Sequence, residues 1–353
     1  MNSYDLCECN KPLQLNYRDT PVPQGSEVLL RVLAAGVCHS DLNFARGYFD
    51  LGGGKRLNIL ERGFKLPITM GHENVGEVVA VGPDSKGVEV GGRHLINSWV
   101  GCGECPVCVR DEEHLCMKPR FLGAYRNGGF ATHIIVPDAR YLLDIGDLAP
   151  EVAAPLACAG ITTFSALKKI NPSVLRDQPI VIIGAGGLGF MALELLKAMG
   201  GRGAVVVDID PVKREAAKAA GALAVVDGTA ADAVAQVQSA VVGGVWAVVD
   251  LVGASSTVQL AMDVVAKGGQ VVIVGMYGGE VTVPTAFFPM RAMTVQGSYL
   301  GSAAEMAELL ELVRRHGAPA IPITTKQLDQ VNEALEDLHS GRVVGRVVLT
   351  AAA

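Results

Sequence analysis

The sequence has few aromatic residues and no strong excess of charge of one sign. Aromatic residues make up 5% of the 353 positions, and 30 Lys and Arg stand against 36 Asp and Glu, a formal net charge of −6. Basic residues do not gather into the stripe that binding to a phosphate backbone requires, so nucleic acid is not expected as a partner. No uncharged apolar run reaches the ~18 residues that a membrane helix needs, so no membrane partner is expected.

The amino-terminal segment lacks the basic start and the apolar stretch of a secretory signal. We therefore expect a cytoplasmic protein, in whose reducing surroundings the eight cysteines need an explanation other than disulfides. The length of 353 residues exceeds what one hydrophobic core usually supports, so two domains are expected.

The second half of the chain alternates short β-branched runs with helical stretches, which predicts a parallel sheet covered by helices. The expected strands are Ile180 to Ile183, Ala204 to Val207, Ala222 to Val226, Val245 to Asp250, Gln270 to Val274 and Met293 to Gln296. The expected helices between them are Leu188 to Met199, Val212 to Ala220, Ala230 to Val242 and Thr257 to Ala266. This is the pattern of a doubly wound α/β fold, whereas the first ~160 residues predict a mainly β domain with Gly and Pro turns.

Four cysteines in a Gly- and Pro-containing segment are spaced C-x2-C-x2-C-x7-C, and they are Cys102, Cys105, Cys108 and Cys116. Four thiolates at such short spacing can surround one tetrahedral Zn²⁺ and leave no open position, which predicts a structural zinc site. Four reduced thiols or an iron–sulfur cluster are the alternatives.

A glycine-rich segment joins the expected strand Ile180 to Ile183 to the following helix, and it comprises Gly184, Ala185, Gly186, Gly187, Leu188 and Gly189. Asp208 follows 19 residues after Gly189, at the end of the next strand. Glycines allow the tight turn and the approach of a pyrophosphate, and the acid can bind the ribose hydroxyls. This predicts a dinucleotide site, and the charge of Asp208 favours NAD over NADP. Lys213 is a further candidate for contact with the ribose, or an ordinary solvated lysine.

Cys38, His72 and Cys158 are far apart in the sequence and together offer two thiolates and one imidazole. Three such ligands leave a fourth position for water or substrate, as a catalytic zinc requires. From spacing alone, a cysteine in an apolar context such as that of Cys158 is more often a buried core residue than a ligand.

The order of these motifs resembles that of the zinc-dependent alcohol dehydrogenases of the medium-chain dehydrogenase/reductase superfamily. The resemblance spans nearly the whole chain and rests on Gly36 to Asp41, Gly71 to Glu73, the four-cysteine segment, Leu156 to Gly160 and Gly184 to Gly189. It implies a mainly β GroES-like catalytic domain over residues 1–158, a Rossmann NAD-binding domain over 159–297, and a segment over 298–353 that returns to the catalytic domain. It also implies a homo-oligomer, with a tetramer favoured over a dimer.

The resemblance assigns roles around two zinc ions per chain. Cys38, His72 and Cys158 become ligands of the catalytic zinc, and Glu73 a nearby or alternate ligand. Ser40 would pass the substrate proton outward, and Asp41 would orient the histidine ligand.

Other positions match cofactor and substrate contacts of the family. His39 would lie by the cofactor phosphates or ribose, Thr162 would back the nicotinamide, and Arg346 would meet the pyrophosphate. Val274 completes the cofactor-binding set. Trp99 resembles an aromatic residue of the substrate pocket, with simple core packing as the alternative.

The chain departs from the family pattern in two places. Asn43 stands where many members have a histidine that ends the proton relay, and an amide cannot take up that proton. The segment Tyr48 to Lys65 makes the interval from Cys38 to His72 longer than expected. We expect a long loop there that walls a substrate channel, or else covers a subunit contact.

These observations predict an NAD- and zinc-dependent alcohol dehydrogenase that interconverts primary or secondary alcohols, bulky or aromatic ones included, with aldehydes or ketones. A polyol or amino-alcohol dehydrogenase is the alternative within the superfamily. A noncatalytic NAD-binding sensor or scaffold is the alternative of a different class, and a zinc-free quinone reductase is disfavoured by both cysteine sets.

Overall fold

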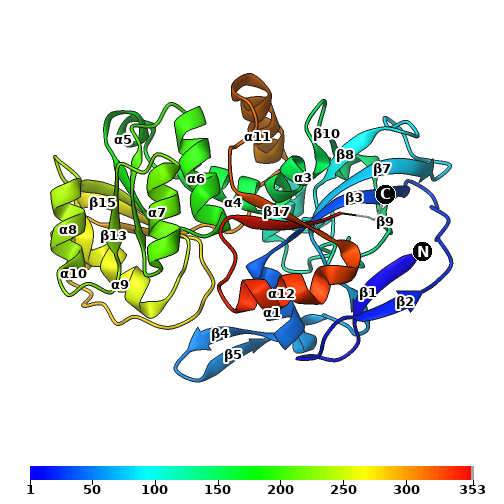
Figure 1. Ribbon diagram of the computed structural model, residues 1–353, viewed down its shortest axis with the longest axis horizontal. Helices are drawn as coiled ribbons and strands as arrows, with labels where there is room; N and C mark the ends of the chain where they lie inside the picture. The colour runs from blue at the N-terminus through cyan, green and yellow to red at the C-terminus, as the bar shows by residue number, and fades with distance from the viewer. Residues whose placement is uncertain (351–353) are drawn as a thin grey trace.

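The structure is a computed structural model that describes residues 1–350, and it has two parts built around different sheets (Figure 1). The first, called here the β-rich part, contains strands β1 to β10 together with β17 and β18. The second, called here the parallel-sheet part, contains strands β11 to β16 and the helices around them.

A seven-stranded sheet forms the centre of the β-rich part, with the order β10-β8-β7-β3-β18-β17 and with β9 also paired to β3. Its strands are β3 (Val28–Val37), β7 (Glu73–Val81), β8 (Arg93–Ile96), β9 (His133–Val136), β10 (Leu142–Asp144), β17 (Ile323–Gln327) and β18 (Arg346–Thr350). Beside it lies a small sheet of β1 (Asn2–Leu6), β2 (Gln14–Tyr17) and β6 (Ile68–Thr69). The end of the chain therefore returns to this part, because β18 pairs with β3.

The parallel-sheet part has the strand order β13-β12-β11-β14-β15-β16, and every pair is parallel. The strands are β11 (Ile180–Ile183), β12 (Ala204–Asp208), β13 (Ala224–Asp227), β14 (Val245–Asp250), β15 (Val265–Ile273) and β16 (Thr294–Gly297). From β11 the chain adds β12 and β13 on one side and then β14, β15 and β16 on the other. The strand order therefore switches between β11 and β14, where a doubly wound sheet binds its ligand. The expected fold class is confirmed.

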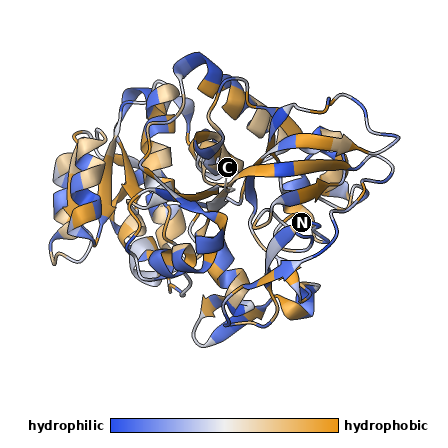
Figure 2. Ribbon diagram, turned by 45° about the vertical axis from the view of Figure 1, so that its right-hand side comes forward, coloured by the Kyte–Doolittle hydropathy of each residue, from blue (hydrophilic) through white to orange (hydrophobic). Residues whose placement is uncertain are grey.

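Helices cover both faces of this sheet because its strands are apolar on both sides (Figure 2). Ile180 and Ile182 face a core shared with α4 (Ala159–Lys168), α6 (Gly187–Ala198), α7 (Pro211–Ala219) and α11 (Ala303–His316). Val181 and Ile183 face the opposite core, which contains α8 (Ala233–Ala240) and α9 (Ser255–Val264). The predicted strands are all present, and the largest difference is that β15 begins five residues earlier than expected.

The segment Tyr48 to Lys65 is not the irregular loop that the sequence predicted. It forms a β-hairpin of β4 (Tyr48–Gly52) and β5 (Lys55–Asn58), followed by the short 3-10 helix η1 (Leu60–Arg62). Ile59 and Phe64 are buried in the core of the β-rich part. Ile59 and Phe64 thus serve packing, Leu51 and Leu60 remain exposed, and the glycines between Leu51 and Lys55 form the turn.

No helix within residues 1–350 is both long and apolar enough to cross a membrane.

Candidate active site and metal centres

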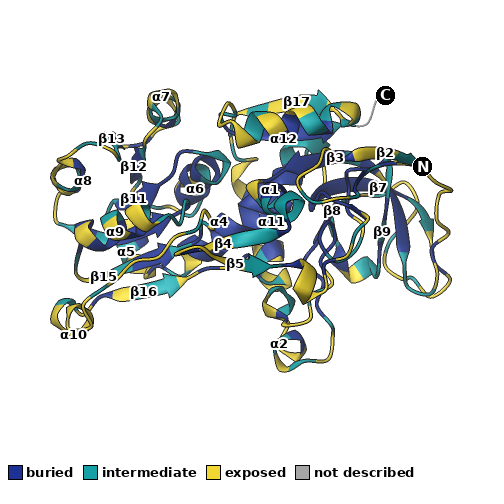
Figure 3. Ribbon diagram, turned by 90° about the horizontal axis from the view of Figure 1, so that it is seen from below, coloured by how far each residue is buried: buried dark blue, intermediate teal, exposed yellow. Residues whose placement is uncertain are grey.

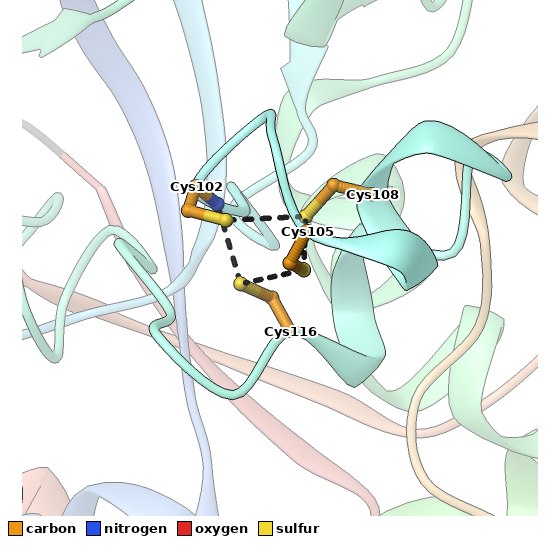
Figure 4. Close-up of side chains that lie close together, drawn as sticks. All are labelled: Cys102, Cys105, Cys108 and Cys116. Atoms are coloured by element: carbon orange, nitrogen blue, oxygen red, sulfur yellow. Dashed lines mark hydrogen bonds between the residues drawn. The ribbon is translucent and has the colours of Figure 1, made fainter.

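The four predicted cysteines meet in an extended lobe between β8 and β9 (Figure 4). The short helix α2 (Pro106–Val109) and the 3-10 helix η2 (Glu113–Leu115) turn the chain so that the sulfurs converge. The Sγ atom of Cys105 lies 3.4 Å from that of Cys108 and 3.8 Å from that of Cys116, and Cys102 lies 3.9 Å from Cys108. A zinc–sulfur distance of about 2.3 Å requires sulfurs about 3.8 Å apart in a tetrahedron, so the four residues fit one zinc ion.

Backbone amides of the lobe stabilise thiolates. The Sγ atom of Cys116 accepts hydrogen bonds from the backbone of Cys102 and of Lys118, each at 3.3 Å. Hydrogen bonds from the backbone of Glu104 and Cys105 lower the pKa of Cys102 to about 6. Burial raises the pKa of Cys108 and of Cys116. Thiolates are the form that binds a metal, so the backbone prepares Cys102 for an ion, whereas Cys108 and Cys116 need the ion itself to lose their protons.

The second predicted cluster is assembled from three distant segments. Cys38 caps the amino end of α1 (His39–Arg46), Cys158 precedes α4, and His72 lies directly before β7. All three are buried, and the two Sγ atoms are 4.0 Å apart. Ligand atoms of these residues and of Glu73 all lie within 4.8 Å of one another. The fold therefore brings together the residues that the sequence keeps apart.

Asp41 connects two of these residues from the first turn of α1. One carboxylate oxygen accepts the backbone N–H of Cys38 at 2.9 Å, and the other lies 3.1 Å from Nδ1 of His72. The carbonyl of His72 accepts a hydrogen bond from the hydroxyl of Ser98 at 2.8 Å. Asp41 thus faces the Nδ1 side of the imidazole and Ser98 fixes the backbone of His72, which leaves the Nε2 atom for another partner.

The donor set fits a zinc ion. The Nε2 atom of His72 is buried and has no hydrogen-bond partner within residues 1–350, which is costly unless a metal takes that place. A hydrogen bond from the Cys158 thiol holds the pKa of Cys38 well below its ordinary value and raises the pKa of Cys158. Burial disfavours protonation of His72, but Asp41 and Cys38 together outweigh burial and raise the pKa of the imidazole well above its ordinary value. One carboxylate and two sulfurs beside a buried imidazole form a strongly electron-donating site.

Glu73 and Arg346 form a buried ion pair at the edge of this cluster. Burial raises the pKa of Glu73 to about 7, although Arg346 opposes that shift. The Arg346 side chain also lies against Gly187, where a Cβ atom would come within 2.3 Å of its Cδ atom. Arg346 therefore connects the metal cluster with the glycine-rich turn.

That turn joins β11 to α6 at the carboxyl edge of the parallel sheet. Gly184 has φ +103°, which favours glycine, and a Cβ atom on Gly189 would lie 2.1 Å from the carbonyl of Gly184. Asp208, at the end of β12, accepts the backbone N–H of Ala185 at 2.6 Å. The glycines and the acid predicted to bind the dinucleotide thus lie side by side.

The remaining predicted cofactor residues surround the same edge. Val274 follows β15 directly and is buried, and Thr162 lies in the first turn of α4, with a buried hydroxyl that has no partner within residues 1–350. Lys213 is in α7, with its Nζ atom 3.9 Å from Asp210. His39 and Ser40 form the exposed to half-buried start of α1, next to Cys38.

Trp99 lies beside the metal cluster rather than in a distant core. Its ring centre is 5.4 Å from that of His72 and 5.3 Å from that of Phe121, and its Nε1 donates to the carbonyl of Ala157 at 2.9 Å. Trp99 belongs to an apolar cluster with Cys38, Phe121, Ala124, Cys158 and Leu300, against which Phe44 and Tyr125 pack.

Phe121, Leu300 and Ser98 were not among the residues predicted from the sequence. Leu300 is a buried residue with φ +52°, an unusual backbone for leucine, and it contacts this cluster from a segment far along the chain. Nothing in the local pattern around Leu300 signals that position. Ser98 directly precedes Trp99, and the same segment after β8 that positions Trp99 brings the Ser98 hydroxyl to the carbonyl of His72.

Comparison with known proteins agrees with this geometry. Residues 24–147 match the alcohol dehydrogenase GroES-like domain, and residues 187–315 match the zinc-binding dehydrogenase family. An NAD-dependent alcohol dehydrogenase of Sulfurisphaera tokodaii is 36% identical over 99% of both chains. A D-arabinose 1-dehydrogenase (NADP+) of Saccharolobus solfataricus is 32% identical over 98% of this chain and 96% of its own.

Among solved structures, the alcohol dehydrogenase of Aeropyrum pernix superposes with a TM-score of 0.88 and 33% identity, covering 99% of this chain and all of that one. The resemblance inferred from the sequence is confirmed. The chain belongs to the zinc-dependent alcohol dehydrogenase family of the medium-chain dehydrogenase/reductase superfamily.

Proposed function

We propose that the chain oxidises alcohols to aldehydes or ketones, and reduces them in reverse, at the cluster of Cys38, His72 and Cys158, with NAD as the partner. The observation that carries this proposal is the position of Arg346. This residue pairs with Glu73 beside the metal cluster and also packs on Gly187 of the glycine-rich turn. A metal site with an open position and a dinucleotide site are thereby adjacent. A noncatalytic scaffold has no need of that arrangement.

The chain's own residues orient the reactants and move the proton. A zinc ion held by Cys38, His72 and Cys158 supplies a Lewis acid that lowers the pKa of an alcohol hydroxyl, and NAD supplies the hydride acceptor. The Ser40 Oγ atom takes the alcohol proton and passes it toward the exposed start of α1. Because Asn43 cannot accept it, the proton leaves through His39 or through water.

Cofactor contacts follow from the turn and its neighbours. The glycines of the turn and the amino end of α6 receive the pyrophosphate, with Arg346 as the positive charge beside it. Thr162 and Val274 border the nicotinamide. Residues 1–158 and 298–353 supply the catalytic domain, and 159–297 the NAD-binding domain. A second zinc ion, bound by the four-cysteine lobe, is structural.

Asp208 sets the preference for NAD, because its carboxylate repels a 2′-phosphate. Replacing it, Asp208→Gly, raises the ratio of NADP to NAD efficiency at least about tenfold, equivalent to about 1.4 kcal/mol. Steady-state rates with both cofactors measure this ratio. Equal use of NADP and NAD by the wild type would contradict the assignment.

The pocket favours bulky or aromatic substrates. Trp99, Phe121 and Leu300 surround the two sulfurs with apolar surface, and Tyr125 packs at the edge of this cluster. A sugar or polyol would leave its hydroxyl groups unpaired against that surface. One relative is a D-arabinose 1-dehydrogenase, so oxidation of polyols is the alternative activity that the experiment must test.

A homo-oligomer in the cytoplasm completes the proposal. β16 is the edge of its sheet and offers unpaired backbone groups to a second copy, and the neighbouring α10 (Phe287–Arg291) exposes Phe287, Phe288 and Met290. None of the eight cysteines is paired in a disulfide within residues 1–350, as expected in a reducing compartment. A tetramer is favoured over a dimer, and light scattering measures the state.

The deciding experiment follows NADH formation by the purified protein over a panel of aromatic, aliphatic and polyhydroxy alcohols. Turnover highest on aromatic or bulky alcohols supports the proposal. Turnover highest on polyols favours the alternative, and binding of NADH without turnover of any alcohol favours the scaffold.

A further inference from the structure

The hairpin of β4 and β5 projects from the β-rich part toward the parallel-sheet part, as two views show (Figures 1 and 3). Gly52, at the end of β4, is buried although the turn residues Gly53 and Gly54 beside it are exposed. A Cβ atom on Gly52 would lie 2.5 Å from the carbonyl carbon of Gly279. The backbones of the two parts therefore touch at this position, with no side chain between them.

The contact is reciprocal. A Cβ atom on Gly278 would lie 2.8 Å from the backbone oxygen of Asp50. Lys55 and Glu280 are 4.0 Å apart, but both are exposed, so this ion pair adds little. Close steric fit between the backbone around Gly52 and that around Gly278 and Gly279 thus forms the contact.

The segment that receives the hairpin is tied to the loops at the carboxyl edge of the parallel sheet. The backbone N–H of Gly278 donates to the carbonyl of Gly253 at 3.3 Å, and that of Glu280 donates to the Ser255 hydroxyl at 3.0 Å. Residue 278 lies four residues after Val274, at the edge where a doubly wound sheet binds its dinucleotide. Movement of the hairpin tip is thereby linked to the proposed NAD site.

The base of the hairpin is packed near the metal cluster. The Phe49 ring meets Phe44 edge-on, with centres 5.8 Å apart, and Phe44 stacks on Phe64 at the same distance. Phe44 also lies edge-on to His72, with ring centres 6.4 Å apart. Packed rings therefore connect His72 with Phe49 at the base of the hairpin, three residues before Gly52.

We propose that the hairpin tip is a clasp between the two parts, which holds them together beside the proposed NAD site and slows the release of NADH. Gly52 and Gly278 are its positioning residues, since each permits the approach of the opposite backbone. This role rests on the proposed place of NAD in the cleft. It differs from a channel wall or a subunit contact, because neither of those requires the hairpin to touch the parallel-sheet part.

Two alanine substitutions in one turn separate the clasp from backbone strain. Gly52 and Gly54 have φ of +82° and +77°, so an added side chain strains both alike, but a Cβ atom on Gly54 meets nothing within 4 Å. We expect Gly52→Ala to accelerate NADH dissociation about tenfold, and Gly54→Ala to leave it unchanged. Displacement of fluorescent NADH in a stopped-flow instrument measures both rates, and hydrogen exchange over residues 276–281 reports the freed segment.

A second variant tests the clasp from the opposite side. Gly278→Ala pushes against Asp50 and is expected to accelerate NADH release as much as Gly52→Ala does. The double variant should release NADH at the same rate as each single variant, because both substitutions break the same contact. Equal acceleration by Gly52→Ala and Gly54→Ala would overturn the clasp. So would faster hydrogen exchange in Gly52→Ala with unchanged NADH release. Failure of the wild type to bind NADH would contradict the proposed NAD site itself, and the clasp with it.

Discussion

The two metal centres differ in how the chain builds them. The four-cysteine lobe takes its ligands from 15 consecutive residues, Cys102 to Cys116, and two of its sulfurs are half-exposed. The cluster of Cys38, His72 and Cys158 draws on segments up to 120 positions apart and is buried throughout. A local site can be closed by short turns, whereas a dispersed one exists only when the surrounding sheets are formed.

The difference extends to the groups around the ligands. Backbone amides of the lobe donate hydrogen bonds to the sulfurs of Cys102 and Cys116, and these amides are present wherever the loop is folded. The buried cluster instead depends on charged side chains, namely Asp41 behind His72 and the pair of Glu73 with Arg346. Changes at the two centres should therefore separate stability from chemistry.

The largest expected effect is on activity, from Cys38→Ser. Loss of one thiolate ligand should remove the catalytic zinc and lower kcat by at least about 10³-fold, equivalent to about 4 kcal/mol. Rates of NADH formation, zinc content and circular dichroism together measure this. Cys7→Ser is the matched control, since Cys7 is a free thiol outside both clusters. Full activity in Cys38→Ser would contradict the assignment.

A substitution in the four-cysteine lobe should lower stability more than activity. Cys108→Ser removes a ligand of the proposed structural zinc and is expected to lower the free energy of unfolding by about 3 kcal/mol. The protein that remains folded should keep most of its kcat. Thermal melts beside rates at a temperature below the transition measure the two effects, and loss of activity without loss of stability would reverse the roles of the two centres.

Asp41→Asn tests the support of the buried cluster while leaving every ligand in place. The amide is neutral and no longer stabilises the imidazole, so zinc affinity or activity should fall about 10- to 100-fold. Titration with a competing chelator measures the affinity. An unchanged affinity would show that the 3.1 Å contact between Asp41 and His72 does not support the metal.

The smallest expected effect is at Glu113, which fastens the lobe to the rest of the molecule. Its carboxylate accepts the backbone N–H of Gly101 at 2.6 Å and the Tyr141 hydroxyl at 2.7 Å. Glu113→Gln should lower the free energy of unfolding by about 1 kcal/mol and leave kcat unchanged. Denaturant unfolding compares the variant with the wild type, and a large fall in kcat would mean that the lobe takes part in catalysis.

The sequence was sufficient to predict the features that are determined by neighbouring residues. The spacing of four cysteines, the glycines before Leu188 and the β-branched run Ile180 to Ile183 each determine structure over a few residues. Leu300 and Phe121 join the apolar cluster around Cys38 and Cys158 only through the packing of distant segments. The hairpin from Tyr48 to Asn58 was missed because its pairing depends on a tight glycine turn and on contacts with residues 278–280, which lie more than 200 positions away.

The central claim is that the chain carries two zinc centres, one for chemistry and one for stability, and metal analysis of the purified protein tests it most directly. Elemental analysis should find close to two zinc ions per chain in the active wild type and close to one in Cys38→Ser, with circular dichroism of the variant unchanged. A content near one in the active wild type, or two zinc ions retained in Cys38→Ser, would contradict it.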